Sequence, residues 1–314
     1  MNMKYVLSVT ANPALDKVLN VRGFKRGIEQ KGSPVFLSAG GKGLNVCRGL
    51  NSMRVACLAT GFVGGLTGEY IQERLRQEGI LFNFMDIPQE TRTNLTLVDS
   101  QNHKITRILE PGPRITSAHV NAFLRKFRHL CSNAVMVIIS GSMIPGAGTD
   151  FYRKIISVAH RLGKDVILDS SHKALVDGIK EKPFMITPNE NEAKFVLNMS
   201  LSSRNYKRKA LENFLRRGVR NVCITLGAKG AIASNGKYFL VAKIPFKIER
   251  HTVGCGDAFV AGFVYAYLRQ KDFKECVRYA VAAGTASMLH QNPGSLQMSQ
   301  VTRMVKRVRL YPLS

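Results

Sequence analysis

The apolar residues of this chain fall into two kinds of segment that alternate along most of its length. Short continuous apolar runs are typical of buried parallel strands, and apolar residues recurring every three or four positions are typical of amphipathic helices. Helices are predicted at residues 117–130, 151–162, 173–179 and 207–217, and strands at 135–140, 166–169, 184–187 and 222–226. This alternation predicts an α/β fold whose mainly parallel sheet is covered by helices on both faces.

The first third of the chain follows this rhythm only in part. Strands at 4–10 and 55–62 and a helix at 67–77 fit the α/β pattern. Residues of about 17–38 and 81–110 are instead rich in short alternating runs that are separated by turn residues. We predict that these two segments form one small β-sheet, a lid that projects from the main domain.

A glycine-rich turn opens a strongly apolar helix late in the chain. Gly254, Cys255 and Gly256 precede Asp257 and an apolar run over residues 258–268. The unpaired N–H groups and the positive dipole end of such a helix start favour an anion. Asp257 has two interpretations there: a base for a hydroxyl that accepts a phosphoryl group, or an acid that merely complements the helix dipole.

A second glycine-rich helix start lies near residue 40 and adds a cation and an amide. Its polar and glycine residues are Gly40, Gly41, Lys42 and Asn45. Neither turn is a standard nucleotide motif. Phe259 stands at the third glycine of the dinucleotide fingerprint, and Gly43 replaces the Ser or Thr of a P-loop.

Polar loops follow several of the predicted strands. Ser140, Asn189 and Thr225 stand at or just after three strand ends, where open α/β sheets bind ligands. Asn189 with Glu192 three residues later is typical of a capping box at a helix start. The same pair could also support a hydrated magnesium ion, with Glu192 acting through water.

The charge balance raises the question of a nucleic-acid partner. The chain has 314 residues and a formal net charge of +25, and much of the excess lies at residues 204–220 and 303–309. Such runs are typical of polyanion binding or of solvated helix faces. Because they lack interleaved aromatic stacking platforms, we favour solvated faces and expect no nucleic-acid partner.

Cysteine usage and hydropathy limit the class of protein further. The six cysteines are scattered and form no zinc or disulfide pattern, so a reducing, cytoplasmic location is expected. The longest uncharged stretch, residues 130–149, contains Asn, Ser, Gly and Pro145, so no membrane span is expected.

Taken together, the two glycine-rich turns resemble the two signatures of the PfkB (ribokinase-like) carbohydrate kinases. Residues 40–45 resemble the first signature and residues 252–257 the second, in the family's order. The resemblance implies one three-layer α/β/α domain over residues 1–314 with a small β-sheet lid. It implies a phosphotransferase that moves a phosphoryl group from ATP to a sugar alcohol group, with Mg²⁺ and a monovalent cation as ions. It also implies a homodimer formed through the lid.

The resemblance assigns roles to residues of this chain. Asp257 would be the general base, and Gly254, Cys255 and Gly256 would form the anion hole. The sugar side would comprise Asp16, Gly40, Gly41, Lys42, Asn45 and Ser140. The ATP side would comprise Asn189, Thr225, Gly227, Lys229, Gly230, Gly256 and Asn292, with Glu192 supporting magnesium through water.

The substrate prediction depends on shorter stretches. Residues 91–94 resemble a segment that brings Arg92 to a substrate phosphate, a task that suits the guanidinium fork, although Arg92 could be a lid surface residue. Residues 108–116 look most like tagatose-6-phosphate kinases, and residues 169–176 are closer to 1-phosphofructokinases.

We therefore expect a ketohexose-phosphate kinase that makes a 1,6-bisphosphate, with tagatose 6-phosphate ahead of fructose 1-phosphate. A 6-phosphofructokinase of the same family is a further alternative. The alternative from another class is a basic nucleic-acid-binding protein that retains the kinase fold.

Overall fold

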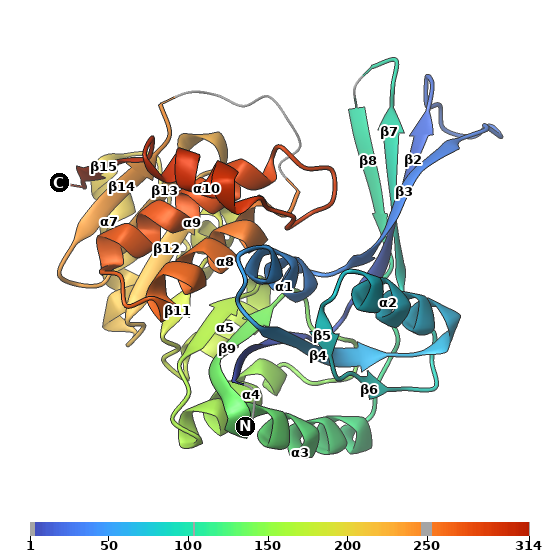
Figure 1. Ribbon diagram of the computed structural model, residues 1–314, viewed down its shortest axis with the longest axis horizontal. Coiled ribbons are helices and arrows are strands. Elements are labelled where there is room, and N and C mark those ends of the chain that lie inside the picture. The colour runs from blue at the N-terminus through green and yellow to red at the C-terminus, as the bar shows by residue number, and fades with distance from the viewer. Residues whose placement is uncertain (1–3, 103, 246–252, 314) are drawn as a thin grey trace.

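A helix-covered body carries a small projecting sheet (Figure 1). The computed structural model describes residues 4–102, 104–245 and 253–313. Thr252, the first residue of the second signature, lies outside the described residues.

The body is built on one large sheet, to which eleven strands of the described part of the chain contribute. Its parallel strands are β5 (Leu81–Phe82), β4 (Cys57–Val63), β1 (Tyr5–Thr10), β9 (Ala134–Ser140), β10 (Val166–Asp169), β11 (Met185–Ile186) and β12 (Asn221–Thr225), in that spatial order. Strand β6 (Met85–Asp86) also pairs with β4 in parallel. The mainly parallel sheet predicted from the sequence is confirmed.

Three antiparallel strands extend the sheet beyond β12, and the sequence analysis did not predict them. They are β13 (Ala231–Ser234), β14 (Phe239–Lys243) and β15 (Arg309–Pro312). Strands β12 to β14 follow one another through short turns, so no α-helix separates them. The helix–strand alternation that reveals parallel strands is therefore missing at this edge.

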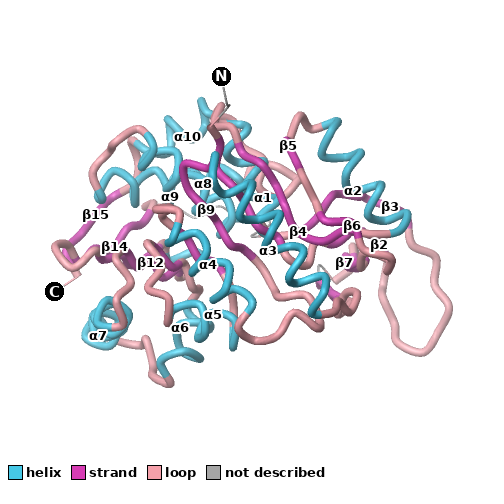
Figure 2. The backbone as a smooth tube through the Cα atoms, turned by 90° about the horizontal axis from the view of Figure 1, so that it is seen from below, coloured by secondary structure: helices cyan, strands magenta, loops and turns pink. Residues whose placement is uncertain are grey.

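Helices cover both faces of the sheet, as Figure 2 shows from below. One face carries α1 (Lys42–Ser52), α2 (Gly65–Gln77), α8 (Cys255–Leu268), α9 (Phe273–Ser287) and α10 (Met298–Val305). The other carries α3 (Ser117–Asn133), α4 (Phe151–Arg161), α5 (His172–Ile179), α6 (Glu190–Leu197) and α7 (Arg204–Arg216). Successive strand residues point to opposite faces, so Val6 joins the first core and Leu7 the second. The three-layer prediction is confirmed.

The projecting lid is a four-stranded sheet in the order β3 (Ser33–Gly40), β2 (Ala14–Val21), β7 (Thr93–Asp99) and β8 (Lys104–Leu109). The prediction that all of residues 81–110 belong to this lid is wrong. Strands β5 and β6 pair with β4 of the body, and the side chains of Phe84 and Ile87 are buried in the two body cores. Burial of these side chains holds the segment against the body, so the second lid segment begins at Thr93.

An aromatic cluster provides a test of how the second core is held together. The Phe123 ring centroid lies 4.7 Å from that of Phe62 and 5.7 Å from that of Phe151, and all three side chains are buried. We predict that Phe123→Ala lowers the free energy of unfolding by about 3–5 kcal/mol, because it leaves a cavity in a close-packed core. Leu66→Ala is the control, because Leu66 is 78% exposed, and it should change stability by about 0.5 kcal/mol or less. If urea denaturation shows that the two variants lose the same free energy of unfolding, this account is contradicted.

Candidate active site

A cavity of about 800 Å³ lies where the carboxyl ends of the body strands meet the lid. It is bounded by the ends of β1, β9, β10 and β12, by the lid strands and by the starts of α1 and α8. Most of the residues predicted from the sequence line it: Asp16, Gly41, Lys42, Asn45, Arg92, Asn189, Glu192, Thr225, Gly227, Gly230, Gly254, Cys255, Gly256 and Asp257. The structure thus brings the predicted sugar side, ATP side and base into one cavity.

Four predicted site residues are not among those that line the cavity. A Cβ on Gly40 would stand 2.2 Å from Asp16 Oδ2, so the role of Gly40 is to leave room for that carboxylate. Ser140 is buried and donates a hydrogen bond to Asp169. Lys229 is exposed on a short 3₁₀ turn, and Asn292 lies in the segment between α9 and α10.

The cavity also contains charged residues that the site prediction omitted. Asp169 stands at the end of β10, in a loop that the sequence analysis singled out without giving the carboxylate a role. Arg107 reaches the cavity from β8, whose pairing places it opposite Thr96. No motif marks Arg107, because its position depends on the register of the lid strands.

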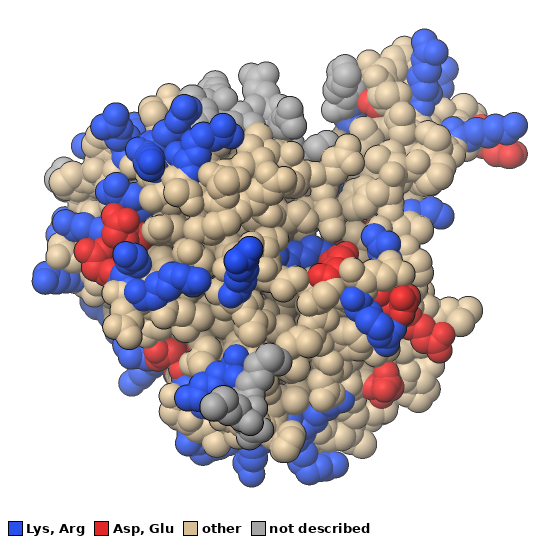
Figure 3. Space-filling model, in the orientation of Figure 1, with Lys and Arg blue, Asp and Glu red and all other residues tan. Residues whose placement is uncertain are grey.

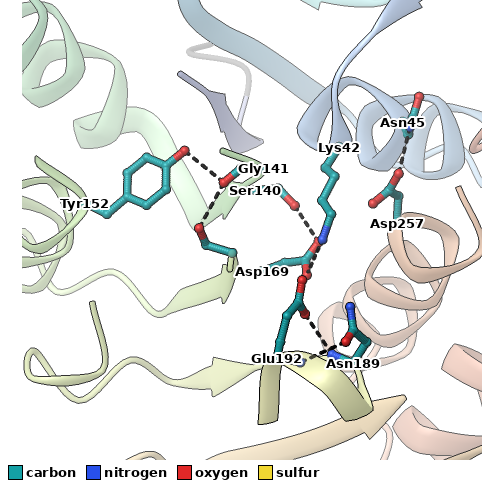
Figure 4. Close-up of polar contacts among 10 residues, drawn as sticks. Lys42, Asn45, Ser140, Gly141, Tyr152, Asp169, Asn189, Glu192 and Asp257 are labelled. Carbon is teal, nitrogen blue, oxygen red and sulfur yellow. Dashed lines mark hydrogen bonds and ion pairs between the residues drawn. The ribbon is translucent and has the colours of Figure 1, made fainter. Parts of the chain in front are cut away.

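Asp257 is buried at the start of α8. Its residue is 4% exposed, and Asn45 Nδ2 donates a hydrogen bond to Asp257 Oδ2 at 2.7 Å (Figure 4). Burial raises the pKa of Asp257 to about 7, although the Lys42 cation opposes the rise. A carboxylate that titrates near neutral pH and faces a cavity is suited to general-base catalysis.

The turn before Asp257 has the backbone geometry of a helix start. Gly254 is the N-cap of α8 and has a φ of 81°, a conformation that glycine adopts without strain. The first intrahelical hydrogen bond runs from Ala258 N to Gly254 O, at 2.9 Å. The N–H groups of the preceding turn are therefore directed out of the helix end, which favours an anion there.

Lys42 crosses the cavity to a carboxylate at the opposite strand end. Its Nζ lies 3.3 Å from Asp169 Oδ1, while Ser140 Oγ donates to Asp169 Oδ2 at 2.8 Å (Figure 4). Asp169 is the main cause of the raised pKa of Lys42, so the lysine is a cation at neutral pH. The site thus combines a fixed positive charge with a buried carboxylate, Asp257, that titrates near neutrality.

Asn189 and Glu192 form the capping box predicted at the start of α6. Asn189 Oδ1 accepts hydrogen bonds from Asn191 N and Glu192 N at 2.9 Å each, and Glu192 Oε2 accepts from Asn189 N at 2.8 Å. Both residues also line the cavity. Burial raises the pKa of Glu192, and Lys42 acts against this shift. The structural interpretation is confirmed, and the magnesium-supporting role stays a prediction.

Arg92 is anchored at the junction of lid and body. Its Nη2 donates to Asn12 O at 2.8 Å, and its Nη1 donates to Glu110 O at 3.0 Å. In the lid next to it, Asn94 Nδ2 donates to Asp16 Oδ1 at 2.8 Å. Arg92 therefore lines the cavity with a fixed orientation.

The cavity wall contains polar atoms suited to a polar ligand. Thr10 Oγ1, Asn12 Oδ1, Asn94 Oδ1 and Thr187 Oγ1 are buried, belong to lining residues and have no hydrogen-bond partner among the described residues. Buried polar groups are normally satisfied, so hydroxyl and phosphate groups fit this wall. No cluster of three metal-ligating side chains occurs in the described part of the chain. A magnesium ion that arrives with nucleotide phosphates and keeps several waters fits such a site.

Charged side chains outside the cavity do not indicate a particular ligand. Figure 3 shows Lys and Arg side chains scattered over the visible face of the body, with acidic side chains among them. That the charge is a solvated surface stays a prediction. None of the helices within the described ranges is both long and apolar enough to cross a bilayer.

Comparisons with known proteins find similarity over nearly the whole chain. The model of the pfkB family carbohydrate kinases matches residues 9–299. A 1-phosphofructokinase of Bacillus subtilis strain 168 is 31% identical over 306 residues, which cover 97% of this chain and 100% of that protein.

Solved structures show the same fold. A Thermotoga maritima protein described as a possible 1-phosphofructokinase superposes with a TM-score of 0.90 at 27% identity, covering 99% of this chain and 100% of that one. Escherichia coli phosphofructokinase-2 in complex with potassium gives a TM-score of 0.90 at 24% identity, covering 97% and 99%. The fold is ribokinase-like, and the protein is a phosphotransferase that acts on a sugar. The chain belongs to the pfkB family of carbohydrate kinases.

Proposed function

We propose that this protein is a 1-phosphofructokinase, which uses MgATP to phosphorylate the 6-hydroxyl of fructose 1-phosphate and makes fructose 1,6-bisphosphate. The observation that carries the proposal is that Asp257, at a helix start, and two arginines on the lid side, Arg92 and Arg107, line the same cavity. From the sequence alone, tagatose 6-phosphate is the first expectation. The names of the Bacillus subtilis and Thermotoga maritima proteins favour its alternative, fructose 1-phosphate.

Phosphoryl transfer to a hydroxyl requires a proton acceptor and a stabilised phosphoryl group. Asp257 would accept the proton of the attacking hydroxyl, a task that its pKa of about 7 permits at neutral pH. The N–H groups of the turn at Gly254, Cys255 and Gly256 would stabilise the moving phosphoryl group, as helix starts do for anions. Lys42 would supply a positive charge to the same group.

The phosphate already on the sugar would lie at the lid side of the cavity. Arg92 and Arg107 provide two guanidinium groups there. A guanidinium group can bind two oxygens of one phosphate at the same time. The carboxylate of Asp16 and the amide of Asn94 would hold sugar hydroxyls between the arginines and Asp257.

The nucleotide would occupy the opposite part of the cavity. Thr225, Gly227 and Gly230 line it in the loop after β12, and Val281 and Met288 add apolar surface suited to a base. Asn189 and Glu192 would support Mg²⁺ through water, while the ion itself neutralises phosphate charge. A monovalent cation is a further expected ligand, and the Escherichia coli neighbour is described in complex with potassium.

The lid supports a proposal about assembly. It carries exposed apolar side chains, among them Val35 at 52%, Ile105 at 47% and Ile108 at 54%. Apolar surface of this kind on a sheet is suited to covering by another chain, so we expect a homodimer through the lid. The scattered spacing of the six cysteines suggests no disulfide framework, so we propose a cytoplasmic location.

The substrate assignment is tested by comparing kcat/KM with MgATP for four sugars. We predict the highest value for fructose 1-phosphate, lower values for tagatose 6-phosphate and fructose 6-phosphate, and a value lower by roughly 10²-fold or more for unphosphorylated tagatose. The last loss is expected because the guanidinium groups of Arg92 and Arg107 would lack the anion that they bind. A maximum with another sugar phosphate would reassign the substrate. No turnover with any sugar, together with DNA binding that persists at physiological salt, would favour the nucleic-acid-binding alternative.

Arg92 is expected to bind the phosphate that the substrate brings. Arg92→Ala should reduce kcat/KM for fructose 1-phosphate by an amount equivalent to about 2–4 kcal/mol, the range for loss of a charged, paired contact. The KM for ATP should stay nearly constant. Arg125→Ala is the matched control, because Arg125 is an exposed arginine of α3 outside the cavity. An equal effect on fructose 1-phosphate and on an unphosphorylated sugar would remove Arg92 from phosphate binding.

A further inference from the structure

A buried ion pair lies behind the candidate base, outside the cavity lining. The side chain of Arg48, in α1, is only 4% exposed, and its Nε lies 2.6 Å from Glu78 Oε2 at the end of α2. Arg48 Nη2 also donates to Ala39 O at 2.5 Å. Removing a guanidinium group from water is costly and does not by itself stabilise a fold, so its role here calls for an explanation.

Arg48 is connected to Asp257 through one amide. Arg48 Nη1 donates to Asn45 Oδ1 at 2.8 Å, and Asn45 Nδ2 donates to Asp257 Oδ2 at 2.7 Å. A guanidinium group only donates hydrogen bonds, so it can bind the oxygen of the Asn45 amide but not its NH₂ group. This selection fixes which end of Asn45 faces Asp257. The flipped amide would place an oxygen against the carboxylate and repel it.

We propose that Arg48, held by Glu78, is a positioning residue for the base: through Asn45 it keeps an N–H donor on Asp257 and fixes the orientation and proton affinity of that carboxylate. This inference rests on the proposed role of Asp257 in phosphoryl transfer. Arg48 is not among the residues that line the cavity, so it would act on the reaction through the Asn45 amide and through its charge near Asp257, without touching the substrate.

The charges around Asp257 give the expected direction of a pH effect. Lys42 and Arg48 lower its pKa, as does the hydrogen bond from Asn45, while burial and the Asp169 carboxylate raise it. The Cys255 thiol lies in the same helix turn. Loss of Arg48 removes one positive charge and releases the amide, and both changes raise the pKa of Asp257. The acidic limb of the kcat–pH profile should therefore move to higher pH.

The test uses Arg48→Met and Arg48→Met/Glu78→Leu with fructose 1-phosphate and MgATP. At pH 7 we expect kcat to fall about tenfold in Arg48→Met, a partial loss of what a general base supplies. The acidic limb should move up by about 0.5 pH unit or more, which accounts for at least about twofold of the loss at pH 7. The loss should therefore shrink at pH 9 to the part caused by a misoriented carboxylate. The KM for MgATP should change less than about twofold. Arg76→Met is the matched control, because Arg76 forms an exposed pair with Glu73 on α2, and it should behave as wild type.

A double-mutant cycle separates positioning from a purely structural role. If Arg48 acts mainly through Asn45, then Arg48→Met should cause a much smaller loss of kcat in the Asn45→Ala background than in the wild type. In Arg48→Met/Glu78→Leu, apolar side chains replace both partners of the ion pair. The melting temperature should then return toward that of the wild type, while the acidic limb of the kcat–pH profile stays at higher pH.

Two results would overturn the inference: a loss of kcat that is the same at every pH, or one that adds fully to that of Asn45→Ala. If Arg48→Met does not fold, Arg48→Met/Glu78→Leu decides, because the inference places its acidic limb at higher pH than that of the wild type. If the wild type is inactive with every sugar phosphate, the proposed function is wrong. If the wild type is active and Arg48→Met behaves like it, only the inference about Arg48 is wrong.

Discussion

The candidate site depends on a carboxylate that is buried at the start of a helix. Asp257 is 4% exposed, and an isolated buried charge is strongly disfavoured. Burial raises its pKa, and the nearby Lys42 cation and the Asn45 amide limit the rise. The result is a carboxylate that is poised between its two protonation states near neutral pH. Such a group can take up a proton during a reaction and release it afterwards.

The parallel sheet explains how distant residues reach this carboxylate. Strands β1, β9, β10 and β12 all deliver their carboxyl ends to the same edge, so the loops that follow them converge on one cavity. Asp169 at the end of β10 then holds Lys42 across from Asp257. Asp16 of the lid and Arg92 at the junction of lid and body line the cavity as well. The body thus supplies the phosphoryl-transfer groups, and the lid supplies groups suited to a sugar phosphate.

Much of this arrangement could be predicted from the sequence, because local patterns carry it. The helix–strand rhythm predicted the parallel sheet, and the glycine-rich turns located Lys42 and Asp257. The antiparallel strands β13 and β14 were not predicted, because only short turns connect β12, β13 and β14 and no α-helix separates them. Strand β15 was not predicted either; it has only four residues and follows α10. Residues 81–92 were misplaced in the lid, because short strands look alike whichever sheet they join. Arg48 gave no signal, since it lies in a run of buried residues over 43–50 and its partner is 30 positions away.

The measurement that tests the central claim most directly is the pH dependence of kcat/KM for fructose 1-phosphate in wild type and in Asp257→Asn, beside a thermal melt of each. A base with a pKa of about 7 predicts a wild-type rate that falls tenfold per pH unit below that value. Asp257→Asn should fold, lose roughly 10²–10⁴ in kcat and lack this limb, because an amide cannot accept the proton. A variant that turns over at nearly the wild-type rate with the limb intact would show that Asp257 only complements the helix dipole.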